Sequence, residues 1–164
     1  MRTLVLGLGN DLYGDDGVGL HAVRLLKKEW DGFNGDRPGS GVVEFAECAL
    51  SGLALLDVVL GYDALVIIDT IAKADPDTGR VRLLDGTDVR DLPGPSPHYV
   101  SIPQTLTIGR QLGLPVPQRV KIVAVEAKDL YRLGEGLSED MTRRLPDIID
   151  ATKGVLNAFG TSLD

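Results

Sequence analysis

Histidine, cysteine and tryptophan are scarce in this chain of 164 residues, which contains two histidines, one cysteine and one tryptophan. The single cysteine, Cys48, excludes an intramolecular disulfide and a zinc site built from several thiolates. His21 and His98 are too far apart for the H-E-x-x-H helix of zinc metalloproteases, and the G-x-S-x-G motif of serine hydrolases does not occur. These two common hydrolase motifs are therefore absent.

Positive charge is also in short supply, since 17 lysines and arginines stand against 24 aspartates and glutamates and leave a formal net charge of −7. A field of that sign repels polyanions, so nucleic acid is not an expected partner. Apolar runs end after about six to eight residues, whereas a membrane helix needs roughly 20, and no signal-peptide pattern follows Met1. We expect a cytoplasmic protein that forms a single domain over residues 1–164 and binds no membrane.

Short apolar runs alternate with amphipathic helical patterns, which predicts an α/β fold. The expected strands are residues 3–8, 42–46, 64–68, 81–84 and 120–126. The connection from residue 68 to residue 81 is too short for a parallel crossover, so strand 81–84 should run antiparallel to its predecessor. The sequence thus predicts a three-layer α/β/α sandwich around a mostly parallel twisted sheet of about five strands with one antiparallel strand.

Helix starts are indicated by polar residues that precede the amphipathic segments. The residues expected to cap the four helices are Asp15 or Asp16, Ser51, Ser101 and Ser138. Pro146 lies inside the last helical pattern and is expected to break or kink it.

A glycine-rich turn over residues 7–19 connects the first strand to the first helix and has some features of a nucleotide-binding loop. However, Leu12 occupies the third glycine position of G-x-G-x-x-G, no P-loop lysine follows, and Asp15 and Asp16 would repel a phosphate. Paired carboxylates favour a cation instead. Simple capping of the helix by the two aspartates is the alternative.

Further polar residues stand where other strands are expected to end, at the edge where parallel sheets bind ligands. Asp69 follows the third strand and Glu126 closes the last, while His98 precedes a helix that must run back from the same edge. Each has an ordinary alternative: a turn aspartate, a strand end or a solvated loop histidine. Together, two carboxylates and an imidazole suit a divalent ion with open coordination positions.

Several segments resemble the maturation endopeptidases of nickel–iron hydrogenases. They are G-L-G-N-x-L at residues 7–12, D-D-G-V-G at 15–19, G-Y-D at 61–63, V-I-I-D at 66–69, S-P-H at 96–98, V-A-V-E at 123–126 and L-G-E-G-L-S at 133–138. The resemblance spans essentially the whole chain and implies a hydrolase of the phosphorylase/hydrolase-like architecture. It departs from the family pattern at Asp16, where some members carry glutamate, and over residues 47–50, where many have a turn with glycine and threonine.

The resemblance implies an endopeptidase that removes the C-terminal extension of a nickel-loaded hydrogenase large-subunit precursor. Asp16, Asp69 and His98 fall on the family's metal-contacting positions and would recognise the nickel, which arrives with the substrate, so no tightly held cofactor is expected. Asp16 and Asp69 are the candidate catalytic residues of a metal-dependent or aspartic-type reaction. Gly9, Asn10 and Glu126 are predicted to contact the substrate. The alternatives are a non-proteolytic nickel-centre chaperone and a nucleotide-binding module with the same fold.

Overall fold

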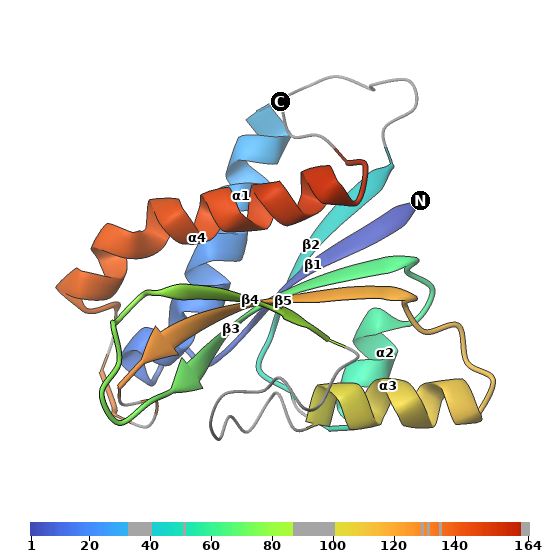
Figure 1. The fold of residues 1–164 in the computed structure, drawn as a ribbon, viewed down its shortest axis with the longest axis horizontal. Helices are drawn as coiled ribbons and strands as arrows, with labels where there is room; N and C mark the ends of the chain where they lie inside the picture. Colours follow the sequence, from blue (N-terminus) through green and yellow to red (C-terminus); the bar gives the residue numbers. More distant parts are fainter. Residues whose placement is uncertain are drawn as a thin grey trace.

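The computed structural model describes residues 1–32, 41–50, 52–86, 101–128, 130, 132–134 and 136–161. Helices and strands alternate through most of this part of the chain (Figure 1). In chain order the elements are β1 (Arg2–Leu8), the 3₁₀ turn η1 (Gly14–Gly17), α1 (Val18–Gly32), β2 (Val42–Cys48), α2 (Ala54–Val59), β3 (Ala64–Ala72), β4 (Val81–Asp85), α3 (Ser101–Gln111), β5 (Arg119–Ala127) and α4 (Glu139–Ala158).

The five strands form one sheet in the order β2-β1-β3-β5-β4. Its neighbouring strands are parallel except for β4, which pairs antiparallel with β5. The predicted reversal of this strand is confirmed, although its hydrogen-bonded neighbour is β5 and not the preceding strand β3. The reversed strand therefore lies at an edge of the sheet, next to the strand that is last in the sequence.

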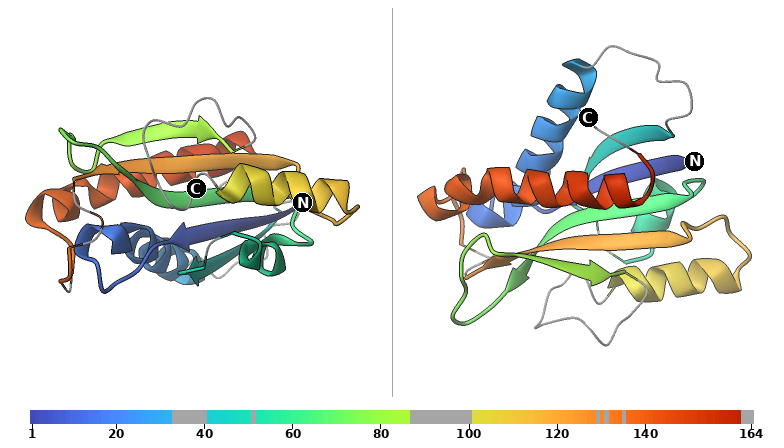
Figure 2. Two further views of the ribbon diagram at one scale, coloured as in Figure 1. Left: turned by 90° about the horizontal axis from the view of Figure 1, so that it is seen from below. Right: turned by 45° about the horizontal axis from the view of Figure 1, so that its top comes forward.

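Helices cover both faces of the sheet and complete the predicted three-layer sandwich. α1 and α4 contact each other on one face, and α2 and α3 contact each other on the other (Figures 1 and 2). The central strand β3 supplies both cores, because Val66 and Ile68 join the core under α1 and α4 while Leu65, Ile67 and Ile71 join the core under α2 and α3. This is why the strand is apolar on consecutive residues and not on alternate ones.

Two strands extend further than their apolar patterns indicated. β3 continues to Ala72 because its ladder with β5 runs on to the pair Ala72 and Ala127. Asp69 therefore lies inside the strand, where it pairs with Ala124, and does not close it. Glu126 likewise lies inside β5. The neighbouring ladder between β1 and β3 ends earlier, at Gly7 and Ile68, so Asp69 marks the point where β3 extends beyond the pairs it forms with β1.

Of the predicted caps, only Ser138 is confirmed: its hydroxyl oxygen accepts a hydrogen bond from the Met141 amide at 3.2 Å at the start of α4. Asp15 and Asp16 do not cap α1, since both lie in η1 and their carboxylates bind other groups. Ser101 is the first residue of α3, and Ser51 lies outside the described residues.

The last helix contains its proline. α4 continues through Pro146 from residue 139 to residue 158, so of the two predicted effects, a break or a kink, the break does not occur. In the part of the chain that the structure describes, no helix combines the length and apolar character needed to cross a membrane.

Candidate functional site

The connection between β1 and α1 is built on close backbone packing. A Cβ atom at Gly7 would meet the Gly19 carbonyl, and one at Gly19 would meet the Ile68 and Leu8 carbonyls, the latter at 2.6 Å. Gly9 has a φ of 149°, and its Cβ would collide with the Asp16 carbonyl. These glycines let the start of α1 lie directly against the ends of β1 and β3. Their spacing is thus explained by packing, without a bound phosphate.

The same connection places the Asp16 carboxylate against the central strand. Its Oδ2 accepts a hydrogen bond from the Asn10 amide at 3.0 Å, and its Oδ1 accepts one from the Thr70 hydroxyl at 3.0 Å. Only 7% of Asp16 is exposed. Both carboxylate oxygens are therefore held by donors from two different segments, one of them the strand that carries Asp69.

Asp69 is fully buried in β3, and its Oδ1 accepts a hydrogen bond from the Thr70 amide at 2.8 Å. Side chains alternate between the faces of a strand. Asp69 lies between Ile67 and Ile71 of the α2 and α3 core, whereas Thr70 follows Ile68 of the α1 and α4 core. Thr70 thus connects the two carboxylates across β3, with its hydroxyl on Asp16 and its amide on Asp69.

The loop that carries Asp16 is fixed at its base by an arginine on α1. Arg24 donates to Asp11 at 2.8 Å and binds both carboxylate oxygens of Glu47, at 2.6 and 2.9 Å. Hydrogen bonds to Glu47 and Asp11 raise the pKa of this guanidinium above its ordinary value. His21 is not packed in the core: its Nε2 lies 3.8 Å from Asp11 Oδ1, and the ring is partly exposed. Cys48 is buried in the apolar core.

Glu126 lies on the same sheet face as Asp69, two residue pairs further along the strands, because Asp69 pairs with Ala124 and Ile71 pairs with Glu126. Its Oε1 accepts hydrogen bonds from Lys73 at 2.9 Å and Arg82 at 3.2 Å. The side chain of Glu126 is 1% exposed, whereas those of Lys73 and Arg82 are 33% and 36% exposed. Glu126 therefore faces two cations at this edge and does not stand as an isolated carboxylate.

The pKa of Glu126 reflects these surroundings. Burial by itself would raise the pKa, but hydrogen bonds from Lys73 and the Asp77 amide, with the charges of Lys73 and Arg82, bring it below its ordinary value. The carboxylate is thus charged at neutral pH, and it forms ion pairs with both cations.

The third predicted metal contact, His98, lies outside the described residues. α3, which follows it in the sequence, runs back toward the start of β5 as expected (Figure 1). Within the described part of the chain, no three histidine, cysteine, aspartate or glutamate side chains come together as a metal site. Of the three predicted metal contacts, the described part of the chain therefore contains the two carboxylates, Asp16 and Asp69.

A groove of about 440 Å³ lies beside η1. Tyr13 and Asp15 line one part of it, and Lys128, Arg132 and Leu133 line another. The two parts are connected by backbone hydrogen bonds, from the residue 14 amide to the residue 134 carbonyl at 2.9 Å and from the residue 134 amide to the residue 12 carbonyl at 3.0 Å. Leu133 is 74% exposed. The groove thus begins one residue away from Asp16 and carries an apolar side chain and two basic ones.

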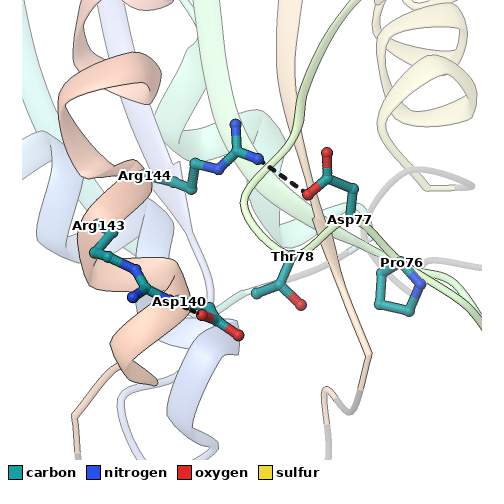
Figure 3. A pocket seen from close by; sticks show the side chains of 6 residues that line it. All are labelled: Pro76, Asp77, Thr78, Asp140, Arg143 and Arg144. Atoms are coloured by element: carbon teal, nitrogen blue, oxygen red, sulfur yellow. Dashed lines mark hydrogen bonds and ion pairs between the residues drawn. The ribbon is translucent and has the colours of Figure 1, made fainter.

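A second pocket, of about 410 Å³, lies between the β3–β4 turn and the start of α4 (Figure 3). Arg144 donates to Asp77 at 3.0 Å across it, and Arg143 pairs with Asp140 on the same helix. It shares Thr78 and Asp140 with the groove beside η1. Neither its lining nor that of the groove contains Asp16 or Asp69.

A protein-family model matches most of the chain. The HycI model, described as hydrogenase maturation protease, matches residues 22–154. The chain belongs to the hydrogenase maturation protease family. Members of this family are hydrolases of the endopeptidase class. The matched region contains Asp69, His98 and Glu126 and begins after Asp16, and the match by itself assigns no role to these residues.

Two curated relatives match over most of the chain. The hydrogenase expression/formation protein HupD of Thiocapsa roseopersicina is 28% identical over 162 residues, which cover 97% of this chain and 69% of that protein. The hydrogenase 2 maturation protease of Escherichia coli strain K12 is 28% identical over 132 residues, which cover 79% of this chain and 76% of the relative. The first match includes the loop that carries Asp16, which the family model does not reach.

Solved structures show the same fold. The hydrogenase maturating endopeptidase HybD from Escherichia coli superposes with a TM-score of 0.76 at 24% identity, covering 99% of this chain and 96% of that one. The [NiFe] hydrogenase maturation protease HybD from Thermococcus kodakarensis has a TM-score of 0.67 at 23% identity, covering 94% and 99%. At these identities the likeness extends to the fold alone, which confirms the predicted α/β sandwich.

Three residues of the site were not identified from the sequence. Thr70 had one local signal, because it is a polar residue next to Asp69 in an otherwise apolar run. Lys73 and Arg82 had none, since the approach of Lys73 to Glu126 depends on the register of β3 against β5 and that of Arg82 on the register of β4 against β5.

Proposed function

We propose that this hydrogenase maturation protease removes the C-terminal extension of a nickel-loaded [NiFe] hydrogenase large-subunit precursor. The observation that carries the proposal is the connection of Asp16 and Asp69 through Thr70, at the place where β3 extends beyond its pairs with β1. Burying a carboxylate costs free energy that hydrogen bonds only partly offset, and two of them at the edge where parallel sheets bind ligands support a role in binding or reaction.

Nickel enters this proposal as part of the substrate. Asp16 and Asp69 offer oxygen ligands, and His98 offers a nitrogen from the segment before α3. Two oxygens and one imidazole leave coordination positions open, which suits an ion already held by ligands of the precursor. The protein would then recognise that nickel has been inserted, and it would need no tightly held cofactor of its own.

The two carboxylates are also the proposed catalytic groups. Hydrolysis of a peptide bond requires a group that takes a proton from the attacking water, and a positioned carboxylate can do this. Asp16 retains a small exposed area whereas Asp69 has none, so Asp16 is better placed to meet the substrate. Each carboxylate accepts one hydrogen bond from Thr70 through a single oxygen, which is compatible with the metal-dependent reaction and with an aspartic-type pair.

The groove beside η1 supports a polypeptide as the substrate. It runs from Asp15 past Leu133, and it continues into the second pocket through Thr78. Gly9 and Asn10 are the proposed contacts at the Asp16 end. Glu126 would act on the substrate only through Lys73 and Arg82, because these two side chains lie between its carboxylate and solvent.

The test is to incubate the purified protein with nickel-loaded large-subunit precursor from the same organism and to follow the precursor's mass. Wild-type protein is expected to shorten it, and nickel-free precursor is expected to remain intact. Asp16→Asn, Asp69→Asn and His98→Ala should each abolish shortening, whereas Asp57→Asn, at an exposed position of α2 outside the groove lining, should not. An intact precursor after incubation with folded wild-type protein contradicts the proposal, and binding without cleavage would indicate a nickel-centre chaperone instead.

A further inference from the structure

Thr70 is a polar residue in the most buried strand of the protein. It is 0% exposed, and it lies between Asp69 and Ile71, which are 0% exposed as well. In the ladder between β3 and β5, Thr70 pairs with Val125. A hydroxyl in such a place loses its contacts with water, so it is tolerated only when it donates or accepts hydrogen bonds inside the protein.

The hydroxyl and the amide of Thr70 are directed to different carboxylates. The hydroxyl carries one proton, and it donates that proton to Asp16 Oδ1 at 3.0 Å. The amide donates to Asp69 Oδ1 at 2.8 Å. Thr70 can reach Asp16 because it lies beyond the last residue pair between β1 and β3. One residue therefore supplies a donor to each of the two acidic side chains, which reach it from opposite faces of the strand.

The orientation of Asp16 depends on Thr70 in particular. The other oxygen of Asp16 is held by the Asn10 amide, which belongs to the same loop as Asp16 and moves with it. The Thr70 hydroxyl connects this carboxylate directly to the sheet. Without the Thr70 hydroxyl, the hydrogen bond from the Asn10 amide remains, but this contact no longer holds the Asp16 carboxylate against β3.

We propose that Thr70 is a positioning residue of the site, whose hydroxyl holds the Asp16 carboxylate in register with Asp69. Its importance for catalysis rests on the function proposed above, whereas its effect on the geometry does not. The β-branched side chain contributes because it has few rotamers in a strand, which fixes the hydroxyl on the side of Asp16. The residue itself need not touch the precursor.

The first test is structural and needs neither metal nor substrate. Crystal structures of the wild type, Thr70→Val and Thr70→Ser are compared around residue 16. Valine keeps the shape and removes the hydroxyl, so the Asp16 carboxylate is expected to turn away from its wild-type position in Thr70→Val and to keep it in Thr70→Ser. Thr70→Ala provides a second variant without the hydroxyl if valine prevents folding. An unmoved Asp16 carboxylate in the variants without the hydroxyl overturns the inference.

The second test measures processing of nickel-loaded precursor. Removing a group that orients a ligand typically costs about ten- to hundredfold in activity, so Thr70→Val should lower kcat by about that factor, and Thr70→Ser should restore most of it. The matched control is Thr3→Val, since Thr3 is also fully buried in a strand but lies at the start of β1, opposite Ala64. A normal kcat in Thr70→Val, or an equal loss in Thr3→Val, would contradict a role in positioning.

The two tests separate the inference from the proposed function. If wild-type protein leaves the precursor intact while Asp16 turns in Thr70→Val, the proteolytic function fails and the positioning of Asp16 stands. If wild-type protein cleaves the precursor while Asp16 is unmoved in the variant, the function stands and the inference fails.

Discussion

Asp15 accepts two hydrogen bonds from Ser138, a residue 123 positions later in the chain. The Ser138 amide donates to Oδ1 at 2.7 Å, and its hydroxyl donates to Oδ2 at 2.8 Å. The same hydroxyl oxygen accepts from the Met141 amide and so caps α4. Asp15 therefore anchors the start of the last helix, while its neighbour Asp16 faces the central strand. Two adjacent aspartates thus have separate tasks, one structural and one in the proposed site.

This relationship predicts that Asp15→Ala destabilises the protein without abolishing processing. Loss of the two hydrogen bonds and the weakened cap should lower the free energy of unfolding by about 1–2 kcal/mol. Ser138→Ala should have a similar effect, and the double variant should cost less than the sum because both changes remove one contact. Urea unfolding of the three variants measures this. Strict additivity of the two single effects would show that the residues are not coupled.

Thr3→Val should stabilise the protein. In the described part of the structure the Thr3 hydroxyl is buried without a hydrogen-bond partner, which costs about 1–3 kcal/mol relative to an apolar group of the same shape. Valine removes the hydroxyl and suits a strand, so we expect the free energy of unfolding to rise by about 1 kcal/mol. A lower midpoint of urea unfolding than that of the wild type would show that the hydroxyl has a partner in solution.

Glu126 predicts a specific response to acid. Its pKa is lowered in the folded protein, so its contribution to stability is present above its ordinary value of 4.5 and is lost as the pH falls below that value through the folded pKa. Glu126→Gln should be about 2 kcal/mol less stable at neutral pH, because Lys73 and Arg82 lose their partner. The difference between variant and wild type should then shrink on acidification. Urea unfolding from about pH 7 to about pH 3 measures it, and a constant difference would contradict the ion pairs as its source.

Two glycines should respond in opposite ways to alanine. A Cβ at Gly19 collides with the Ile68 and Leu8 carbonyls, so Gly19→Ala should destabilise the protein by about 3 kcal/mol or more and displace the start of α1. Gly154 lies in α4 with no atom within 4 Å of its Cβ position, so Gly154→Ala should stabilise by about 0.5–1 kcal/mol. Thermal unfolding distinguishes the two. Equal effects would mean that close packing of the loop is not the reason for glycine at position 19.

Leu133 tests the groove beside η1 as the path of the substrate. The side chain is 74% exposed, so Leu133→Asp should leave the fold unchanged. If the precursor packs against it, KM for processing should rise by about tenfold, with kcat little affected, because only binding energy is lost. Leu112→Asp is a matched control, since Leu112 is 67% exposed and follows α3, outside the groove lining. An unchanged KM in Leu133→Asp would exclude contact between this residue and the substrate.

The local features of the fold were predictable because they depend on neighbours in sequence. The cap at Ser138 follows from a polar residue before an amphipathic segment, and the reversal of β4 follows from the short connection after β3. The end of β3 was not predictable, because its last residues are held by pairs with β5, as Ala72 is by Ala127, which lies 55 positions later in the chain. The caps expected at Asp15 and Asp16 were wrong because both carboxylates found partners far away in the chain.

The sequence by itself determined the α/β class, the glycine-rich connection and the acidic residues placed near the ends of strands, because periodicity and motif spacing are local properties of the chain. Only the tertiary structure decided that Asp15 binds α4, that Glu126 faces two cations, and that Thr70 connects Asp16 with Asp69. The physical reason is strand register: a shift of one residue moves every side chain to the other face of the sheet. Pairing across the sheet therefore decides which donor each buried carboxylate meets.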